Sequence, residues 1–529
     1  MATEPQAVSH DRLPSGPIEF RDDPFVPQRP AALRQLSPPG DIVFNGFTSI
    51  QVNVDAGGNN IVGDAANEPS IAVAPNHPNR MVIAWRQFDS IANNFRQAGW
   101  AYSHDGGRNW TFPGVIEPGV FRSDPVLEAD TEGNFYYYSL TTDNAAYLCH
   151  VFTSTDAGVS WNTGVYAYGG DKGWMAIDRT GGIGEGIIHT AWDYAGCCGN
   201  DWYTRSTDQA ASFQPPIPIP GQPIWGMTAV GPDGEVYVAG RRNSTNTEFV
   251  VAKSTTVRDP MAALGFDFTV QVDMGGVHRY FLGAGPNPGG LNGNVCVAAD
   301  HSVSPTRGNV YVLASVDPAG SDPMDVHVVR SEDGGLTWSS PVRVNDDPIG
   351  NNAWQWFAAM DVAPTGRIDA VWNDTRAEPG GVDSQLYYSF STDAGQTWSP
   401  SVPVGPAFDP HLGWPNQNKL GDYYDMVSDR VGAHVAYAAT YNGEQDVYYV
   451  RIGEYDCNDN GVGDETEIDA GASDVNSNEI PDACEPGIVP ASSPRALTWM
   501  VILLFAAAVV ALRRSAARGP HRVDDHACG

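Results

Sequence analysis

Basic residues are scarce in this chain. Its 529 residues contain 30 Lys and Arg against 63 Asp and Glu, which gives a formal net charge of −33 at pH 7. A surface this acidic repels phosphate backbones, so the composition predicts no nucleic-acid partner. Long amphipathic helical patterns are also missing, whereas glycine (57), proline (40), tryptophan and tyrosine are abundant. This composition is typical of an all-β protein.

Cysteine is also rare. Seven cysteines in 529 residues do not encode a dense disulfide framework. Cys149 and Cys296 lie in strand-like runs, where we expect buried thiols. Cys457 and Cys484 bracket a small acidic segment and are a candidate pair. The adjacent Cys197–Cys198 stand in an AGCCGN loop, where we expect neither metal binding nor redox chemistry.

Long hydrophobic runs are absent with one exception. The first residues, MATEPQAVSHDRLPSG, contain no apolar core of a signal peptide. Further on, Ala496–Leu512 reads ALTWMVILLFAAAVVAL without a charge, and three arginines follow it. This length is near the lower limit for a membrane-spanning helix, and the arginines would hold the residues after it in the cytoplasm. The run predicts a membrane helix over 496–514, in an arrangement that resembles bacterial C-terminal sorting tails.

The chain does contain a repeat. Four segments share the pattern Ser-x-Asp-x-Gly-x-x-Trp: SHDGGRNW from Ser103, STDAGVSW from Ser154, SEDGGLTW from Ser331 and STDAGQTW from Ser391. RSTDQAASF, from Arg205, is a degenerate fifth copy. The Asp carboxylate can accept backbone N–H groups in a tight turn, the Gly permits positive φ, and the Trp can pack between neighbouring sheets. Repeats at intervals of roughly fifty to sixty residues predict a modular ring or solenoid.

The repeated turn resembles the Asp box, or BNR repeat, of the sialidase-type β-propellers. In that family the Asp box serves the turn and not the chemistry, so the resemblance implies a scaffold. It covers about three quarters of the chain, and function does not follow from the scaffold alone.

Seven strand pairs support a propeller. Tight turns such as TEGN, GPDGE and APTGR join the two strands of a pair. An early strand, FTSIQVNVD from Phe47, has no partner before it and would close the last sheet beside DVYYVRI from Asp446. Closure of this kind removes exposed sheet edges. We therefore expect an all-β protein, a β-propeller of seven four-stranded blades over residues 46–453. Six blades are the alternative, because sialidases have six.

Two acidic loops follow the ring. DCNDNGVGDETE (456–467) fits the EF-hand loop pattern at every specified position, and DVNSNEIPDACE (474–485) is a weaker copy in which Glu479 replaces the turn glycine. A hard cation needs such a dense set of oxygens. The pair resembles dockerin or thrombospondin type 3 calcium repeats, which implies structural calcium in a stiff spacer. The expected ligands are Asp456, Asn458, Asn460, Val462 (through its carbonyl), Asp464 and Glu467, and then Asp474, Asn476, Asn478, Asp482 and Glu485.

Ligands of propellers bind around the central axis, on the face opposite the repeated turns. That face receives the residues that come just before each first strand and just after each second strand. Those before the first strands are Glu68, Asp124, Asp171, Lys172, Trp225, Asn294, Trp354, Trp356, Asp422 and Tyr423. Those after the second strands are Arg86, Asp89, Asp193, Arg241, Arg242, Asn373, Asp374 and Arg376.

The resemblance implies roles for part of this set. Sialidases clamp a substrate carboxylate with three arginines, because guanidinium binds carboxylate bidentately. They use a Tyr nucleophile activated by a Glu, with an Asp as the acid/base. The catalytic residues implied here are Arg86, Arg242 (or Arg241), Arg376, Tyr423 (or Tyr424) and Asp89, with Glu185 or Glu248 to activate the Tyr. Apart from the resemblance, the candidate substrate contacts are Asp374 and Trp225, Trp354 and Trp356, whose rings can stack on sugars; the alternative is that these Trp residues fill the space between blades.

Two functions fit these features. One is a cell-surface-anchored exo-glycosidase of sialidase type that acts on sialylated or related acidic glycans. The other is a non-catalytic propeller that binds a glycan or a protein at the cell surface. The expected segments are 1–45 (disordered), 46–453 (propeller), 454–486 (calcium-binding spacer), 487–495 (linker), 496–514 (membrane helix) and 515–529 (cytoplasmic tail).

Overall fold

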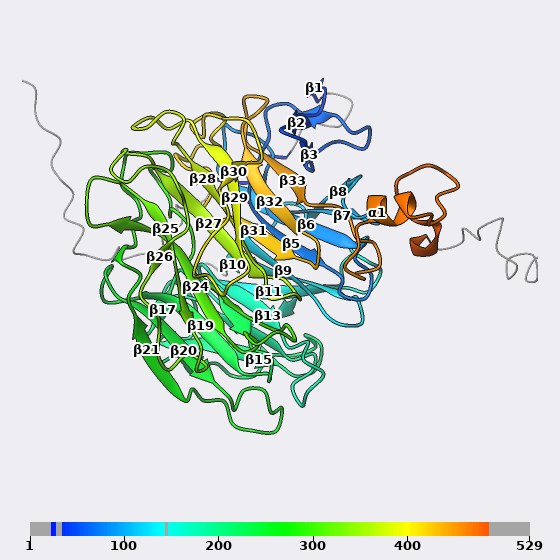
Figure 1. Cartoon of the computed structure of the whole chain (residues 1–529). Coiled ribbons are helices and arrows are strands. Elements are labelled where there is room, and N and C mark those ends of the chain that lie inside the picture. The colour runs from blue at the N-terminus through cyan, green and yellow to red at the C-terminus, as the bar shows by residue number, and fades with distance from the viewer. Residues whose placement is uncertain (1–22, 28–33, 143–145, 486–529) are drawn as a thin grey trace, which may run out of the picture. The chain divides into compact units, whose positions relative to one another are not determined.

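The computed structural model describes residues 23–27, 34–142 and 146–485 (Figure 1). The chain forms two compact units that divide between Gly461 and Val462, a few residues beyond the boundary expected at 453. Within the described ranges, no helix has the length and apolar character needed to cross a membrane. The membrane helix predicted at 496–514 lies outside the described residues, as do the linker and the tail on either side of it.

The first unit consists of seven antiparallel sheets, here called blades 1 to 7 in chain order from β5. Blade 1 contains β5 (Ala65–Val73), β6 (Met81–Phe88), β7 (Arg96–Ser103) and β8 (Thr111–Ile116). Blade 2 contains β9 (Ser123–Ala129), β10 (Phe135–Thr142), β11 (Tyr147–Ser154) and β12 (Val165–Tyr166). Blade 3 contains β13 (Trp174–Ile177), β14 (Ile188–Ala191), β15 (Asp201–Ser206) and β16 (Ile217–Pro218).

The next three blades have the same order, with a split inner edge in two of them. Blade 4 contains β17 (Pro223–Ile224), β18 (Thr228–Val230), β19 (Val236–Arg242), β20 (Phe249–Ser254) and β21 (Phe268–Val272). Blade 5 contains β22 (Gly276–Val277), β23 (Cys296–Ala299), β24 (Val310–Pro318), β25 (Asp325–Ser331) and β26 (Val342–Arg343). Blade 6 contains β27 (Gln355–Val362), β28 (Ile368–Asp374), β29 (Gln385–Ser391) and β30 (Val402–Pro403).

Blade 7 closes the ring with strands from both ends of the unit. It contains β31 (Asp425–Ser428), β32 (Ala433–Ala439) and β33 (Asp446–Ile452), followed by β3 (Phe47–Gln51) and β2 (Ile42–Phe44). In the closing pair, Ile50 lies opposite Tyr449. The predicted closure is confirmed. Regular structure begins before the expected boundary at residue 46, because β2 and β1 (Leu36–Ser37) precede β3; β1 pairs with β4 (Asn60–Ile61).

The seven innermost strands surround one axis. Each of β5, β9, β13, β18, β23, β27 and β31 contacts the next, and β31 contacts β5 (Figure 1). The count is therefore seven blades, and the alternative of six is wrong. The core lies between the faces of neighbouring blades, where most of the buried apolar side chains pack.

The repeated turns join the third and fourth strands of their blades. In the turn from Ser331, the Asp333 carboxylate accepts the backbone N–H of Thr337 at 2.9 Å, and the hydroxyl of Thr337 also donates to it. These hydrogen bonds lower the pKa of Asp333 to about 2, and the bond from the Thr337 side chain has the largest effect. Gly335 has φ 92°, as the sequence predicts. The Trp residues pack between blades: the Trp110 ring lies 5.3 Å from that of Tyr449 in blade 7.

The second unit is small, and its described part ends at residue 485. It contains a short helix, α1 (Asp464–Asp469), and a 3-10 turn, η2 (Asp482–Cys484). Two of the cysteine predictions are confirmed in the first unit, because Cys149 and Cys296 are buried free thiols.

Candidate functional site at the blade entrances

A residue with left-handed backbone conformation stands at the entrance of every blade. Positive φ is uncommon for residues with a side chain and costs on the order of 1–3 kcal/mol, and such residues cluster at functional sites. Register shifts between Asn67 and Ser70 and between Trp356 and Ala359 mark two of the resulting breaks. The seven residues are Glu68 (50°), Asp124 (46°), Lys172 (50°), Trp225 (57°), Gly293 (122°), Phe357 (57°) and Gly421 (117°).

The charged members of this set meet in one buried ion network. The Lys172 ammonium lies 2.6 Å from Oδ2 of Asp422, 3.2 Å from Oδ2 of Asp124 and 3.9 Å from Oε1 of Glu68. Lys419 lies 2.7 Å from the same Asp422 oxygen, and Nε of Arg86 lies 3.1 Å from Oε2 of Glu68. All of these side chains are at most 3% exposed. The network joins blades 1, 2, 3 and 7 across the axis.

Burial changes the protonation of this network. It raises the pKa of Glu68 to about 8, although the Arg86 and Lys172 charges act in the opposite direction. It also raises the pKa of Asp193, at the end of the second strand of blade 3, to about 7. The ammonium of Lys172 stays charged, because Asp124 and Asp422 outweigh the effect of burial and raise its pKa. The site therefore combines carboxyls whose pKa values are raised with an ammonium whose pKa is also raised.

Arg241 occupies the neighbouring part of the site, at the end of β19. Successive side chains on a strand point to opposite faces, so Arg241 points inward and Arg242 outward. Arg241 is only 1% exposed. Its guanidinium carbon lies 4.2 Å from the centre of the Trp225 ring and 5.1 Å from that of Tyr280. Burial lowers its pKa.

The Arg241 guanidinium is not neutralised. Its Nε and Nη2 atoms have no hydrogen-bond partner, and no carboxylate in the described part of the chain forms an ion pair with it. A buried polar group without a partner is rare in native proteins and calls for a specific cause, such as an absent ion or ligand. The nearest acidic influence is Asp193, whose Oδ2 accepts the indole N–H of Trp225 at 3.0 Å.

Two further buried atoms beside Arg241 lack partners. The Tyr194 hydroxyl is one, and Nδ1 of His278 is the other. The His278 ring lies 6.0 Å from that of Trp225, and burial lowers its pKa to about 4, so it is neutral at pH 7. Nε2 of His278 faces the Gly293 carbonyl at 3.0 Å, so Nε2 must hold the proton and Nδ1 is an acceptor. Hydrogen-bond donors (Arg241 and the Tyr194 hydroxyl) and an acceptor (Nδ1 of His278) therefore lie in this part of the site without protein partners.

Several residues predicted from the sequence belong to this site. Arg86 and Trp225 are in it, as described above. Tyr423 is also buried, with its hydroxyl donating to the Pro125 carbonyl at 2.9 Å and its ring 5.5 Å from that of Trp174. Burial, together with the charge of Glu68, raises the pKa of Tyr423 well above its usual value. A phenolate is thus disfavoured in this arrangement, and Glu68 is the acid beside the Tyr.

Other predicted residues lie elsewhere. Arg242 pairs with Glu248 at 2.6 Å near the surface, and Arg376 pairs with Asp374 at 2.8 Å and Asp346 at 2.6 Å. The structure thus gives Arg86, Arg242 and Arg376 different carboxylate partners, and it does not bring the three together on one. Trp356 is buried with its indole N–H donating to Ser384, Trp354 and Asp89 are half-buried, and Tyr424 donates its hydroxyl to the Ala438 carbonyl.

Glu185 is far from Tyr423 in the fold. It lies in the turn between the first and second strands of blade 3, where it accepts the Thr131 hydroxyl and the Gly181 N–H. That turn is at the opposite end of the inner strand from the blade entrance. No sequence pattern pointed to Tyr194, His278, Tyr280 or Lys419, because these residues stand in loops without periodicity.

A separate cavity of about 450 Å³ occupies the axis at the end where the inner strands finish. Its wall is largely apolar and includes Ile71, Leu127, Met227, Val297 and Met360. It shares no residue with the ion network or with Arg241. The molecule therefore has an open apolar cavity at one end of the axis and a closed polar site at the other.

Comparisons with known proteins add little beyond the architecture. No protein-family model and no curated protein match the sequence. Among solved structures, the chain is similar to a protein of unknown function from Dyadobacter fermentans (14% identity, 77% of this chain and 97% of that one, TM-score 0.43). It is also similar to the α-L-arabinofuranosidase Arb93A of Fusarium graminearum (12%, 78% and 98%, TM-score 0.41) and to the phage phi92 endosialidase (9%, 77% and 69%, TM-score 0.42). Similarities of this size carry no argument about activity.

Proposed function

We propose that this protein is a glycan-active propeller that takes an acidic sugar at the blade entrances, with Arg241 receiving the sugar's carboxylate. The observation that carries this proposal is the buried guanidinium of Arg241, which has no carboxylate partner in the described residues. Nε and Nη2 stand on the same edge of a guanidinium, and that edge binds carboxylates bidentately. An anionic ligand would supply the charge that the protein lacks there.

The neighbouring groups suit a sugar acid. The free Tyr194 hydroxyl can donate to a ligand oxygen, and Nδ1 of His278 can accept from a ligand hydroxyl. Entry requires a displacement, because Arg241 is buried and the half-buried Tyr280 lies against it. Tyr280 is on the segment between β22 and β23, a loop, and loops are the parts of a propeller best able to move.

Hydrolysis of the bound glycan is the second candidate function. It is favoured by the arrangement of carboxyls: Asp193 and Glu68 have pKa values near 7 and 8, whereas Asp422 lies 2.6 Å from the ammonium of Lys172 and 2.7 Å from that of Lys419. A proton donor and a second carboxylate are the pair that glycoside hydrolysis needs. Asp193 is the proposed proton donor, and Trp225 links it to Arg241: the indole N–H of Trp225 donates to Asp193, and its ring packs against the guanidinium of Arg241. The alternative is a propeller that binds the glycan without cleaving it.

Binding and hydrolysis are tested separately. Calorimetric titration with N-acetylneuraminate should give binding that Arg241→Met abolishes and Arg242→Met leaves unchanged. N-acetylglucosamine, which has no carboxylate, should not bind. Equal binding of the two sugars, or equal loss in the two arginine variants, would contradict the proposal. For hydrolysis, the protein should release 4-methylumbelliferone from at least one member of a panel of 4-methylumbelliferyl glycosides that includes the sialoside, and Asp193→Asn should lose this activity. Sugar binding without release of the fluorophore from any member of the panel would support the propeller that binds the glycan without cleaving it.

We further propose that the two acidic loops bind calcium. Both loops make the same turn: the carboxylate of Asp456 accepts the N–H groups of Asn460 and Gly461, and that of Asp474 accepts those of Asn478 and Glu479. Gly461 (φ 85°) and Glu479 (φ 64°) take the left-handed conformation at equivalent places. Oxygen donors on such a turn fit Ca²⁺, which would stiffen the segment after the propeller.

We propose a cell-surface position as well. The motivation is the uncharged run 496–512 followed by arginines, which has the composition of a membrane anchor. Fractionation of cells that express the full chain tests it. Full release of the protein into the soluble fraction would refute the anchor, and retention that is lost when 496–514 is deleted would support it.

A further inference from the structure

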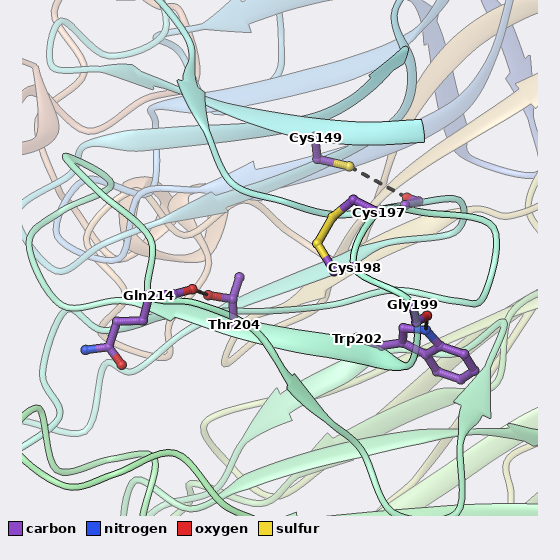
Figure 2. Close-up of a disulfide and its surroundings, with 8 residues drawn as sticks. Cys149, Cys197, Cys198, Gly199, Trp202, Thr204 and Gln214 are labelled. Carbon is purple, nitrogen blue, oxygen red and sulfur yellow. Dashed lines mark hydrogen bonds between the residues drawn. A yellow bond between two sulfur atoms is a disulfide. The ribbon is translucent and has the colours of Figure 1, made fainter. Parts of the chain in front are cut away.

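The adjacent cysteines of blade 3 form a disulfide (Figure 2). Cys197 and Cys198 stand in the loop between β14 and β15, and Cys198 is exposed while Cys197 is half-buried. Cys198 has φ 76°, a left-handed conformation that a residue with a side chain rarely takes. A backbone outlier of this kind persists only where its surroundings impose it, and here the link to the neighbouring residue does so.

This loop leads directly to the polar site. Its first residues follow Asp193 and include Tyr194, and the charges of both residues act on Arg241. Its backbone is joined to the segment that carries Lys172: the Cys197 N–H donates to the Gly169 carbonyl at 3.0 Å, and the Asp171 N–H donates to the Ala195 carbonyl at 3.0 Å. The loop is therefore continuous with Asp193 and Tyr194 on one side and hydrogen-bonded to the segment before Lys172 on the other.

The two backbones pack without space between them. Gly170 and Gly196 form an isolated bridge, and a Cβ on Gly170 would lie only 2.6 Å from the Cα of Gly196. Figure 2 places the third cysteine, Cys149, near the pair. Its thiol is buried and donates to the Gly170 carbonyl, and burial raises its pKa to about 12. It is therefore held as a neutral thiol that does not attack the disulfide.

We propose that Cys197–Cys198 is a redox-reactive modification site whose reduction releases the loop 194–200 from the segment 169–171. The reductant is a dithiol. Its first thiolate attacks the exposed Sγ of Cys198, the S–S bond breaks, and Cys197 leaves as a thiolate that takes a proton. The second thiolate of the reductant then attacks its own sulfur in the mixed disulfide. Cys198 leaves and is protonated, and the reductant becomes a cyclic disulfide.

Reduction removes the link that imposes the left-handed turn. Cys198 is then free to return to an ordinary backbone conformation, and the hydrogen bonds of the loop to 169–171 loosen. The reduced pair is a vicinal dithiol. Its two soft sulfur ligands make it a binding site for thiophilic centres such as trivalent arsenic. This differs from the sequence-based expectation of an inert pair, because the exposure of Cys198 and its backbone conformation are not visible in the sequence.

The test uses the whole folded protein and no sugar ligand, so its result is independent of the proposed function. Dithiothreitol treatment without denaturant is followed by alkylation and peptide mass spectrometry, which reads each cysteine separately. We expect Cys197 and Cys198 to be alkylated while Cys149 stays protected, and the reduced protein to capture phenylarsine oxide at this pair. Amide exchange at Cys197 and Asp171 should rise at least tenfold on reduction.

Two variants keep the test decisive. Cys197→Ala with Cys198→Ala should show the fast exchange without any reductant and should lose arsenical capture. Cys457→Ala with Cys484→Ala is the control, since these residues are also disulfide-bonded; it should keep the reductant-dependent change in loop exchange. The proposal is overturned if the pair stays oxidised until Cys149 also becomes reactive, or if reduction leaves the exchange of Cys197 and Asp171 unchanged.

Discussion

Replacement of Arg241 by methionine should make the protein more stable while it removes binding of the acidic sugar. Most buried arginines are paired with a carboxylate, and their loss destabilises a protein. Arg241 is different, because it is 1% exposed and two of its nitrogens have no partner. Methionine has a similar length and fills the space between Trp225 and Tyr280 without a charge.

The size of the effect follows from opposing contributions. Each unsatisfied buried donor costs about 1–3 kcal/mol, so removal of two of them gains roughly 4 kcal/mol. The contacts of the guanidinium with the two aromatic rings are worth about 0.5–2 kcal/mol each and are lost, which takes away roughly 2.5 kcal/mol. The variant is therefore expected to be more stable by about 1–2 kcal/mol.

Arg86 offers the matched control. It is equally buried but pairs with Glu68 at 3.1 Å, so Arg86→Met leaves a buried carboxyl without its partner and should cost about 1–3 kcal/mol. Urea unfolding of the two variants, followed by circular dichroism with the slopes compared, measures both changes. If Arg241→Met is destabilised as much as Arg86→Met, Arg241 is a structural residue and the argument for a ligand carboxylate fails.

Three further predictions concern pH, ring closure and calcium. The pKa values of Asp193 (about 7) and Glu68 (about 8) lie above those of the unfolded chain, so their stabilising contribution is complete below about pH 4 and is lost as the pH rises to 8, by at most about 1.4 kcal/mol per pH unit and group. Both groups contribute to this slope below pH 7, so the unfolding free energy of Asp193→Asn should lose about half of the slope between pH 4 and 7 and keep the slope from 7 to 8; an unchanged slope would contradict this. Deletion of residues 41–51 removes β2 and β3, exposes the edge of β33 and should cause aggregation in size-exclusion chromatography, whereas a stable monomer with the wild-type melting temperature would argue against closure by this pair. Glu479 holds a left-handed conformation that costs a residue with a side chain about 1 kcal/mol, so Glu479→Gly removes this cost and should tighten calcium binding by the second loop about fivefold. Asp474→Asn should weaken calcium binding by the same loop. Calorimetry that shows neither change would rule out calcium at this loop.

The fold was predictable from the sequence because each of its levels leaves a local pattern. The strand pairs alternate with turn residues, and the Ser-x-Asp-x-Gly-x-x-Trp turns mark the third strand of four blades. Ring closure was predictable because the strand at Phe47 has no neighbour in sequence, and it pairs with β33 as expected.

The site was predictable only in part. Spacing from the strand ends predicted that Glu68, Lys172 and Asp193 share one face, and the structure brings these three residues together. It did not identify the arginine that points inward, because the choice between Arg241 and Arg242 depends on a one-residue register in β19. It also could not show that Arg376 is held by Asp374 and Asp346, since ion pairs across loops have no periodic signal.

A structure of the protein soaked with N-acetylneuraminate tests the central claim most directly. The account predicts that the sugar's carboxylate lies within hydrogen-bond distance of Nε and Nη2 of Arg241, with Tyr280 displaced. Sugar bound only in the apolar axial cavity, or an Arg241 that remains covered at saturating sugar, would contradict it.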